Sequence, residues 1–305
     1  MDYNSLINLA RDSFDIGDYE KAIYYYETAF EENPESVFVL DIVDLGLAYL
    51  ESGNYDKSLA ILEDVLEQSP TGYIGYHFLG VYYFRIDDKE KAIEWFLKSY
   101  ENDDRTVECL FDLGLLYDEL GNYDNALNFY EKTLEIDENH FYGNLNMGAI
   151  YQEKGRYELA LKYAMIAHES NPTEHFACYN VGVALGLMKR YEEALDWYLK
   201  EIELDDFCVD SYYNMGIIYK DFYKDYNKSI ENYLKAISFN SQDYRYWYNL
   251  GCVYCLKNDF EKASDAFMNS SYINSKVIDY IEKDEETQEF IKSSFYKKIK
   301  DVYTN

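Results

Sequence analysis

VECLFDLGLLYDELGNYDNALNFYEKTLEIDENH, residues 107–140, is the fullest copy of a unit that recurs along the chain. Its marks are a Leu-Gly-x-x-Tyr motif centred on Gly114, a small residue (Ala126) twelve positions later and a large one (Tyr130) four positions after that. The turn between them is Gly121-Asn122-Tyr123-Asp124, in which glycine permits a left-handed helix end and a polar residue opens the next helix. The stretch therefore predicts two helices joined by a tight turn.

The same motif returns at an almost constant interval. Its glycines are spaced by 34, 34, 34, 34, 34 and 35 residues, at Gly46, Gly80, Gly114, Gly148, Gly182, Gly216 and Gly251. A weaker first copy precedes them, with Ala22 and Tyr26 in register and Ala10 in place of the glycine. Such regularity indicates a repeat array, in which each unit packs on its neighbours.

This pattern resembles the tetratricopeptide repeat, a helix–turn–helix unit with Leu-Gly-x-x-Tyr, Ala-x-x-x-Phe and Pro marks. The resemblance implies an all-α protein, a right-handed α-solenoid of antiparallel helix pairs. It also implies that the first helix of each repeat, here the A helix, lines the inner surface where protein ligands bind. The eight predicted repeats cover residues 3–277, at about 3–36, 39–72, 73–106, 107–140, 141–174, 175–208, 209–243 and 244–277.

Three departures from the pattern predict local structure. Two extra residues between the first two repeats predict a longer A helix in repeat 2. One extra residue near Phe222–Asp225 predicts a bulge in repeat 7. Residues 278–305 lack the motif but keep Ile291, Phe295, Ile299 and Val302 at helical spacing, which predicts a capping helix over the last repeat.

The charge of the chain limits its partners. Its 305 residues include 28 Lys and Arg against 58 Asp and Glu, a formal net charge of −30. A chain this acidic repels nucleic-acid phosphates and anionic membrane surfaces, so we expect neither as a partner. With no long apolar run, no signal-peptide pattern and five irregularly spaced cysteines, we expect a soluble cytoplasmic protein with reduced thiols.

The sequence carries no established catalytic motif. Cys252-x-x-Cys255 lies within a predicted helix and lacks further ligands nearby, so it is interpreted as packing and not as a metal or redox pair. His175 and Cys178, one turn apart, are interpreted in the same way. We therefore expect no enzyme activity, no cofactor and no metal.

The candidate binding residues lie on the predicted A helices. The position two before each glycine is asparagine in the last four repeats: Asn146, Asn180, Asn214 and Asn249. An amide carries both a donor and an acceptor, so such a row can hold the backbone of an extended peptide. It resembles the asparagine ladder in the tetratricopeptide region of O-GlcNAc transferase. The alternative is that asparagine is only the consensus residue of the repeat there.

Aromatic and acidic residues accompany the row. Tyr179, Tyr213 and Tyr248 each precede one of the asparagines, and the alternative for them is partial burial between A helices. Repeat 4 concentrates negative charge in four acidic residues: Glu108, Asp112, Asp118 and Glu119. At the other end of the row, Arg245 could bind a carboxylate of the ligand. These residues predict an extended ligand with Lys or Arg near the end that faces the acidic residues of repeat 4.

The sequence therefore predicts a non-enzymatic adaptor that binds a basic, extended segment of a partner protein. Two alternatives remain open at this point. One is a structural protein that self-associates through its end helices, and the other is a regulatory subunit of an enzyme encoded elsewhere.

Overall fold

The computed structural model describes residues 1–103 and 105–303, and within them it contains helices and no strand. Asp104, in the third predicted repeat, and Thr304 and Asn305, at the end of the predicted cap, lie outside the described residues. The chain forms two compact units, Met1–Gly143 and Asn144–Asn305, and α9 contains the boundary between them. The all-helical fold predicted from the sequence is confirmed.

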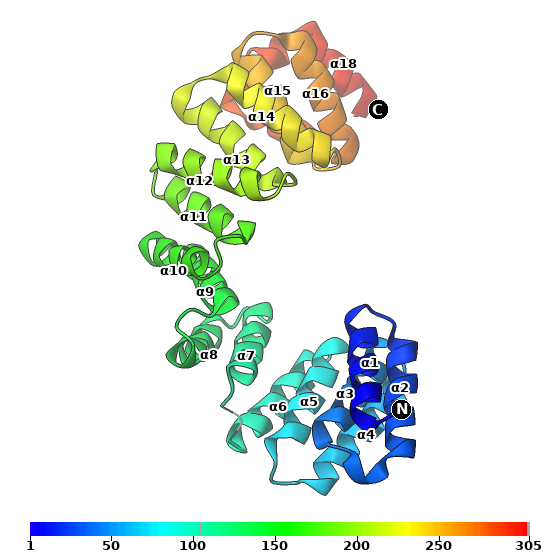
Figure 1. The fold of residues 1–305 in the computed structure, drawn as a ribbon. Helices are drawn as coiled ribbons and strands as arrows, with labels where there is room; N and C mark the ends of the chain where they lie inside the picture. The colour runs from blue at the N-terminus through cyan, green and yellow to red at the C-terminus, as the bar shows by residue number, and fades with distance from the viewer. Residues whose placement is uncertain (104, 304–305) are drawn as a thin grey trace. The chain divides into compact units, whose positions relative to one another are not determined.

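The first unit is a series of helix pairs in which each helix packs on the next (Figure 1). Its helices are α1 (Tyr3–Asp15), α2 (Tyr19–Glu32), α3 (Val39–Glu51), α4 (Tyr55–Gln68), α5 (Tyr73–Arg85), α6 (Lys89–Glu101), α7 (Val107–Glu119) and α8 (Tyr123–Ile136). The helices lie two to each predicted repeat, the first being the A helix and the second the B helix.

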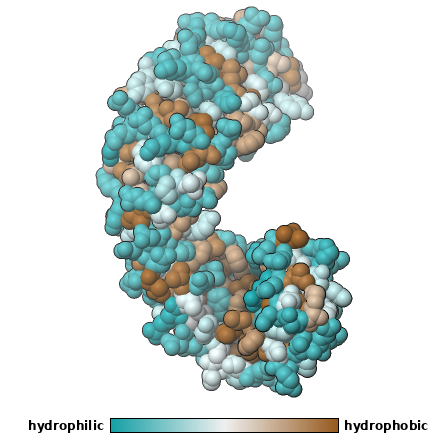
Figure 2. Space-filling view, in the orientation of Figure 1, coloured by the Kyte–Doolittle hydropathy of each residue, from teal (hydrophilic) through white to brown (hydrophobic). Residues whose placement is uncertain are grey.

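Hydrophilic residues cover much of the visible surface of the chain, with hydrophobic residues scattered among them (Figure 2).

The repeated glycine allows the two helices of a pair to approach closely. A Cβ atom added to Gly114 in α7 would lie 2.6 Å from ring carbons of Tyr130 in α8. Tyr130 and Ala126 are both completely buried. The small residue and the aromatic ring on the B helix therefore fit against a surface of the A helix that has no side chain.

The second unit continues the pairs and ends in two shorter helices (Figure 1). Its helices are α9 (Phe141–Glu153, begun in the first unit), α10 (Tyr157–Ser170), α11 (His175–Leu187), α12 (Tyr191–Leu204), α13 (Val209–Ile218), α14 (Tyr226–Phe239), α15 (Tyr244–Leu256), α16 (Phe260–Ile273), α17 (Val277–Lys283) and α18 (Ser294–Tyr303). No helix in the described part of the chain combines the length and apolar character needed to cross a membrane.

The two extra residues between repeats 1 and 2 do not lengthen the A helix of repeat 2. The helix α3 has 13 residues, as α1 does, and the insertion is taken up by a 3-10 turn at Pro34–Ser36 and the residues after it. The physical reason is Pro34, which lacks a backbone N–H and favours the first position of a new helical turn. The prediction of a longer helix was wrong.

The extra residue in repeat 7 forms the predicted bulge. Residues Tyr219–Tyr223 adopt a π-helical turn at the end of α13. Lys224 follows in a left-handed conformation, with φ 54°, and the next helix then begins at Tyr226. A π-turn absorbs one residue without breaking the helix, so the packing of α13 on α14 is retained.

The segment after repeat 8 packs on the last repeat, but as two helices and two 3-10 turns instead of one helix. Phe290 is completely buried, and its ring centroid lies 5.2 Å from that of Phe267 and 5.9 Å from that of Phe260. Ile299 is also fully buried, whereas Val302 is 60% exposed. The segment covers apolar side chains of α16, and Phe290 lies at the centre of that contact.

Candidate functional site

The predicted asparagine row lies on the A helices α9, α11, α13 and α15 of the second unit. Each of the four residues is half-buried, so each is partly packed against neighbouring side chains and partly exposed to solvent. The hydrogen bonds of Asn249 show what its amide already contacts.

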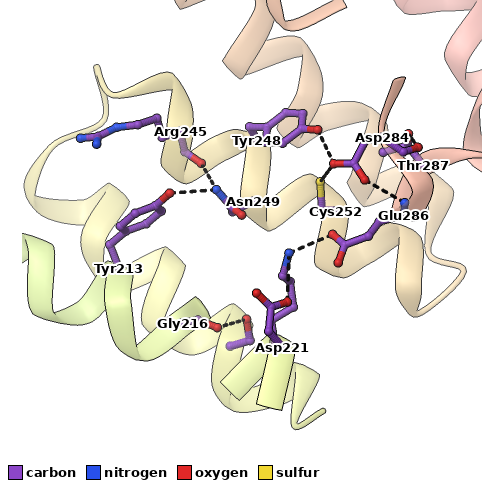
Figure 3. Close-up of polar contacts among 12 residues, drawn as sticks. Tyr213, Gly216, Asp221, Arg245, Tyr248, Asn249, Cys252, Asp284, Glu286 and Thr287 are labelled. Atoms are coloured by element: carbon purple, nitrogen blue, oxygen red, sulfur yellow. Dashed lines mark hydrogen bonds and ion pairs between the residues drawn. The ribbon is translucent and has the colours of Figure 1, made fainter. Parts of the chain in front are cut away.

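Asn249 is bonded to the preceding repeat. Its Nδ2 donates to the Tyr213 hydroxyl at 3.1 Å and to the Arg245 carbonyl at 3.0 Å (Figure 3). An amide nitrogen has only two hydrogens, so both are used. The remaining capacity of Asn249 is its Oδ1 oxygen, which can accept a hydrogen bond from a ligand N–H. The two-way contact expected from the sequence is therefore reduced to an acceptor.

Asn214 lies one repeat before Asn249 and lines a hollow together with Tyr198 of α12. Burial raises the pKa of Tyr179, and the charge of Asp210 raises it further. Burial also raises the pKa of Tyr213. Both tyrosines are therefore partly buried, and the Tyr213 hydroxyl is the one that accepts a hydrogen bond from the asparagine row, at Asn249.

Tyr248 and Arg245 have partners within the second unit. The Tyr248 hydroxyl donates to the Asp284 carboxylate, so this side chain faces the C-terminal segment (Figure 3). The pKa of Tyr248 is raised by burial and by neighbouring Cys252 and Asp284. The Arg245 guanidinium pairs with Asp243 and lies 5.6 Å from the ring centroid of Tyr213. Arg245 is thus held at the surface by a carboxylate and an aromatic face.

A hollow of about 460 Å³ lies beside the asparagine row. It is lined by Leu145, His175, Phe176, Tyr179, Asn180, Glu201, Phe207, Cys208, Val209 and Asp210. Residues of α9, α11 and α13 meet there, so the hollow opens between successive A helices. Phe176 is 51% exposed and Phe207 is 73% exposed, and the lining contains two carboxylates but neither Lys nor Arg. Sequence reasoning missed Phe207 because it lies in the loop after α12.

The buried floor of this hollow contains a hydrogen-bonded carboxylate. Glu201 is only 4% exposed; one of its oxygens accepts from the Ser211 hydroxyl, and the other lies 3.3 Å from His175 Nδ1. Burial raises the pKa of the Cys208 thiol, and the charges of Glu201 and Asp205 raise it further. The hollow therefore contains two carboxylates, the buried Glu201 and the exposed Asp210.

The predicted acidic residues of repeat 4 lie on α7 in the first unit. Glu108 is exposed and Asp112 and Asp118 are half-buried. Glu119 is paired with Lys89 of α6 at 2.9 Å. Burial raises the pKa of Asp118, and the nearby charge of Glu119 raises it as well. The negative charge of this face is smaller than the sequence suggests, because Lys89 compensates part of it.

A second hollow, of about 310 Å³, lies in the first unit between repeats 1 and 2. Its lining is Arg11, Phe14, Asp15, Tyr26, Asp44 and Leu47. Arg11 donates to Asp41 at 2.8 Å and to Asp44 at 3.3 Å. Its charge is therefore paired with two carboxylates of α3, so this hollow, unlike the one in the second unit, already contains a cation.

Comparison with known proteins identifies the repeats. Tetratricopeptide repeat models match residues 3–36, 43–105, 90–139, 177–208, 209–243 and 244–276. The chain belongs to the tetratricopeptide repeat family. These models describe a repeat that supports protein–protein interaction and indicate no enzyme family.

Several proteins are similar to this tetratricopeptide repeat protein in sequence or in fold. It is 35% identical over 113 residues to "Protein CTR9 homolog" of Arabidopsis thaliana, a match that covers 36% of this chain and 10% of that protein. Cut9 in the APC/C hetero-tetramer Cut9–Hcn1 is similar with a TM-score of 0.58 at 16% identity, over 94% of this chain and 55% of the other. MamA is similar with a TM-score of 0.50 at 25% identity, over 57% and 94% of the two chains. This chain therefore spans only part of the first two relatives.

Proposed function

We propose that this protein is a non-enzymatic adaptor that binds an extended, basic segment of a partner protein on the A-helix face of its second unit. The single observation that supports this most is the 460 Å³ hollow between α9, α11 and α13, with exposed aromatic rims and an acidic lining. The tetratricopeptide repeat is an interaction scaffold, and this hollow is the place on it that is best suited to a side chain of a partner.

The chemistry of the hollow favours a cation. Phe176 and Phe207 offer exposed aromatic faces that attract Lys or Arg. Asp210 and Glu201 add negative charge, and a cationic side chain inserted between them would be partly shielded from water. Charge complementarity of this kind sets both the choice of partner and the rate of encounter.

The asparagine row would hold the backbone next to the inserted side chain. The free acceptor of Asn249 suits a peptide N–H, and Asn180 lines the hollow itself. Because asparagines recur at one-repeat intervals, an extended chain can meet Asn146, Asn180, Asn214 and Asn249 in turn. The acidic residues of α7, in the first unit, carry charge of the sign that attracts a basic segment, and such attraction weakens with salt.

The test is selection of a phage-displayed random peptide library on the full chain, followed by fluorescence anisotropy with the enriched peptides. We expect enrichment of Lys and Arg. Phe176→Ala and Asp210→Asn should each weaken binding about fivefold or more, which corresponds to roughly 1 kcal/mol. Matched controls on the B helix α12 are Leu199→Ala and Glu203→Gln, both at exposed positions, and these should leave binding unchanged.

Two results would overturn the proposal. One is enrichment of peptides without basic residues. The other is enriched peptides whose affinity responds equally to the α11 and α13 variants and to the α12 controls, since binding would then occur elsewhere on the repeats.

A further inference from the structure

We infer that His175, Asp205 and Cys208 form a binding site for a zinc-class divalent metal ion where repeats 6 and 7 meet. His175 opens α11, and Asp205 and Cys208 lie in the loop between α12 and α13. Their ligating atoms all lie within 4.8 Å of one another, and Cys208 is 4% exposed. His175 and Cys208 also line the hollow proposed to receive a basic side chain, so a bound metal ion would compete with that side chain. The metal titration below contains no peptide, so its outcome is separate from that of the peptide selection.

The three ligand atoms are close to the separations that tetrahedral zinc needs. Zinc bonds of about 2.0–2.3 Å place neighbouring ligand atoms roughly 3.3–3.6 Å apart. His175 Nε2 already lies 3.4 Å from the nearest Asp205 oxygen. Asp205 Oδ1 accepts a hydrogen bond from the Phe207 N–H at 2.9 Å, which holds the carboxylate with its Oδ2 facing His175. The remaining adjustment is a small rotation of side chains.

A buried carboxylate fixes the orientation of the histidine. His175 Nδ1 lies 3.3 Å from Glu201, and Glu201 in turn accepts a hydrogen bond from Ser211. When Nδ1 donates its hydrogen to Glu201, the lone pair of Nε2 is directed toward Asp205 and Cys208. Histidine ligands of metals are commonly oriented by a carboxylate in this way. The same contacts give the buried Glu201 carboxylate the hydrogen bonds that a buried polar group requires.

A similar cluster in the same unit shows why this site favours a metal. Cys252, Asp284 and Glu286 also bring their ligating atoms together. There, the ammonium group of Lys220 lies 2.9 Å from Glu286, and Tyr248 donates to Asp284 (Figure 3). The C-terminal cluster therefore already contains a cation, and a metal ion would be repelled by it. At the repeat 6–7 site the facing groups are carboxylates, a histidine and a thiol.

The donor atoms select the class of metal. One nitrogen, one oxygen and one sulfur suit zinc or cobalt, whereas calcium and magnesium prefer oxygen ligands alone. Binding converts the Cys208 thiol to a thiolate, and its proton passes to solvent. Three protein ligands leave a fourth position, which water or a donor group of a ligand in the hollow can occupy.

The test uses the full-length chain, stripped with a chelator and titrated with Co²⁺. We expect one equivalent to give a thiolate-to-cobalt charge-transfer band and the visible bands of tetrahedral cobalt, both removed by competing Zn²⁺. Cys208→Ser should abolish the charge-transfer band, and Glu201→Gln should weaken metal affinity roughly 10-fold to 100-fold. The matched control Cys252→Ser should keep the full spectrum.

Far-UV circular dichroism of each variant shows whether it folds. Asp205→Ala, at a half-buried loop position, gives a second loss-of-ligand variant should Cys208→Ser unfold. The inference is overturned if wild type gives no charge-transfer band, if the visible bands are octahedral, or if Cys252→Ser removes the band while Cys208→Ser does not.

Discussion

The amide nitrogen of Asn249 donates to the hydroxyl of Tyr213 at 3.1 Å, and this bond connects the A helices of repeats 7 and 8. Asn249 therefore has a structural role even without a ligand. This bond leaves the oxygen of Asn249 as the part that a peptide can contact.

We predict that Asn249→Ala destabilises the second unit by about 1 kcal/mol, because one hydrogen bond between repeats is lost. A double-mutant cycle with Tyr213→Phe should give a coupling energy of similar size. The measurement is urea unfolding of both single variants and the double variant. Asn269→Ala is the control: Asn269 is exposed on α16 and donates to Asp265 in its own helix, so its change should be within about 0.5 kcal/mol. Additive costs at Asn249 and Tyr213 would contradict the prediction.

We predict that alanine is tolerated differently at two equivalent glycines. At Gly182 a Cβ atom would lie 2.6 Å from the ring of Tyr198, so Gly182→Ala should cost about 1–3 kcal/mol through overpacking. At Gly148 the nearest atom is the Ala160 carbonyl oxygen at 3.3 Å, because repeat 5 has Ala164 in place of the aromatic residue. Gly148→Ala should therefore cost clearly less.

Unfolding in urea measures both costs, and hydrogen exchange locates them. Since repeats stack on their nearest neighbours, Gly182→Ala should reduce protection in α11 and α12 before α15 and α16. Equal costs at the two glycines, or a uniform loss of protection, would show that the aromatic contact does not control the close approach.

We predict that Phe290 is the principal anchor of the C-terminal segment. Phe290→Ala should cost about 3–5 kcal/mol, since it removes a fully buried ring that contacts Phe260 and Phe267. Deleting residues 287–305 should expose the same side chains of α16 and promote aggregation, which sedimentation over a range of concentrations detects. Val302→Ala is the matched control, because Val302 is 60% exposed. A deletion variant that stays monomeric with unchanged stability would mean that the segment is not a cap.

We predict that the protein loses stability as the pH rises above 10. Burial and the hydrogen bond to Asp41 raise the pKa of Tyr3 from 10.0 to about 12. A folded-state pKa above the unfolded one gives stability that is complete below pH 10 and is lost as the pH rises to 12. Burial raises the pKa values of Tyr26, Tyr198 and Tyr233 in the same direction.

The measurement is the free energy of unfolding against pH, followed together with tyrosinate absorbance. Tyr3→Phe should make the decline between pH 10 and 12 less steep, whereas Tyr272→Phe, at a side chain that is 82% exposed, should leave it unchanged. A decline unaffected by Tyr3→Phe would place the alkaline sensitivity elsewhere.

The sequence alone was enough for the helix pairs, their turns and the bulge at Tyr219–Tyr223. These features depend on contacts within one repeat of about 34 residues, such as Gly114 against Tyr130. The residues that make these contacts recur, with few exceptions, from repeat to repeat. The extra residues before α3 were placed wrongly, because spacing counts an insertion but does not say which side of a helix boundary receives it.

Only the tertiary structure decided which side chains meet across a repeat boundary. His175 and Cys208 are 33 positions apart, and the sequence paired His175 only with Cys178, yet the stacking of repeat 7 on repeat 6 brings His175 and Cys208 together with Asp205. In the same way, the sequence showed a row of asparagines but did not show that the Tyr213 hydroxyl already accepts a hydrogen bond from Asn249. The repeat pattern determines the backbone because local packing is the same in each unit. The chemistry at the junctions depends on the residues in which neighbouring repeats differ, and their contacts exist only once those repeats are packed.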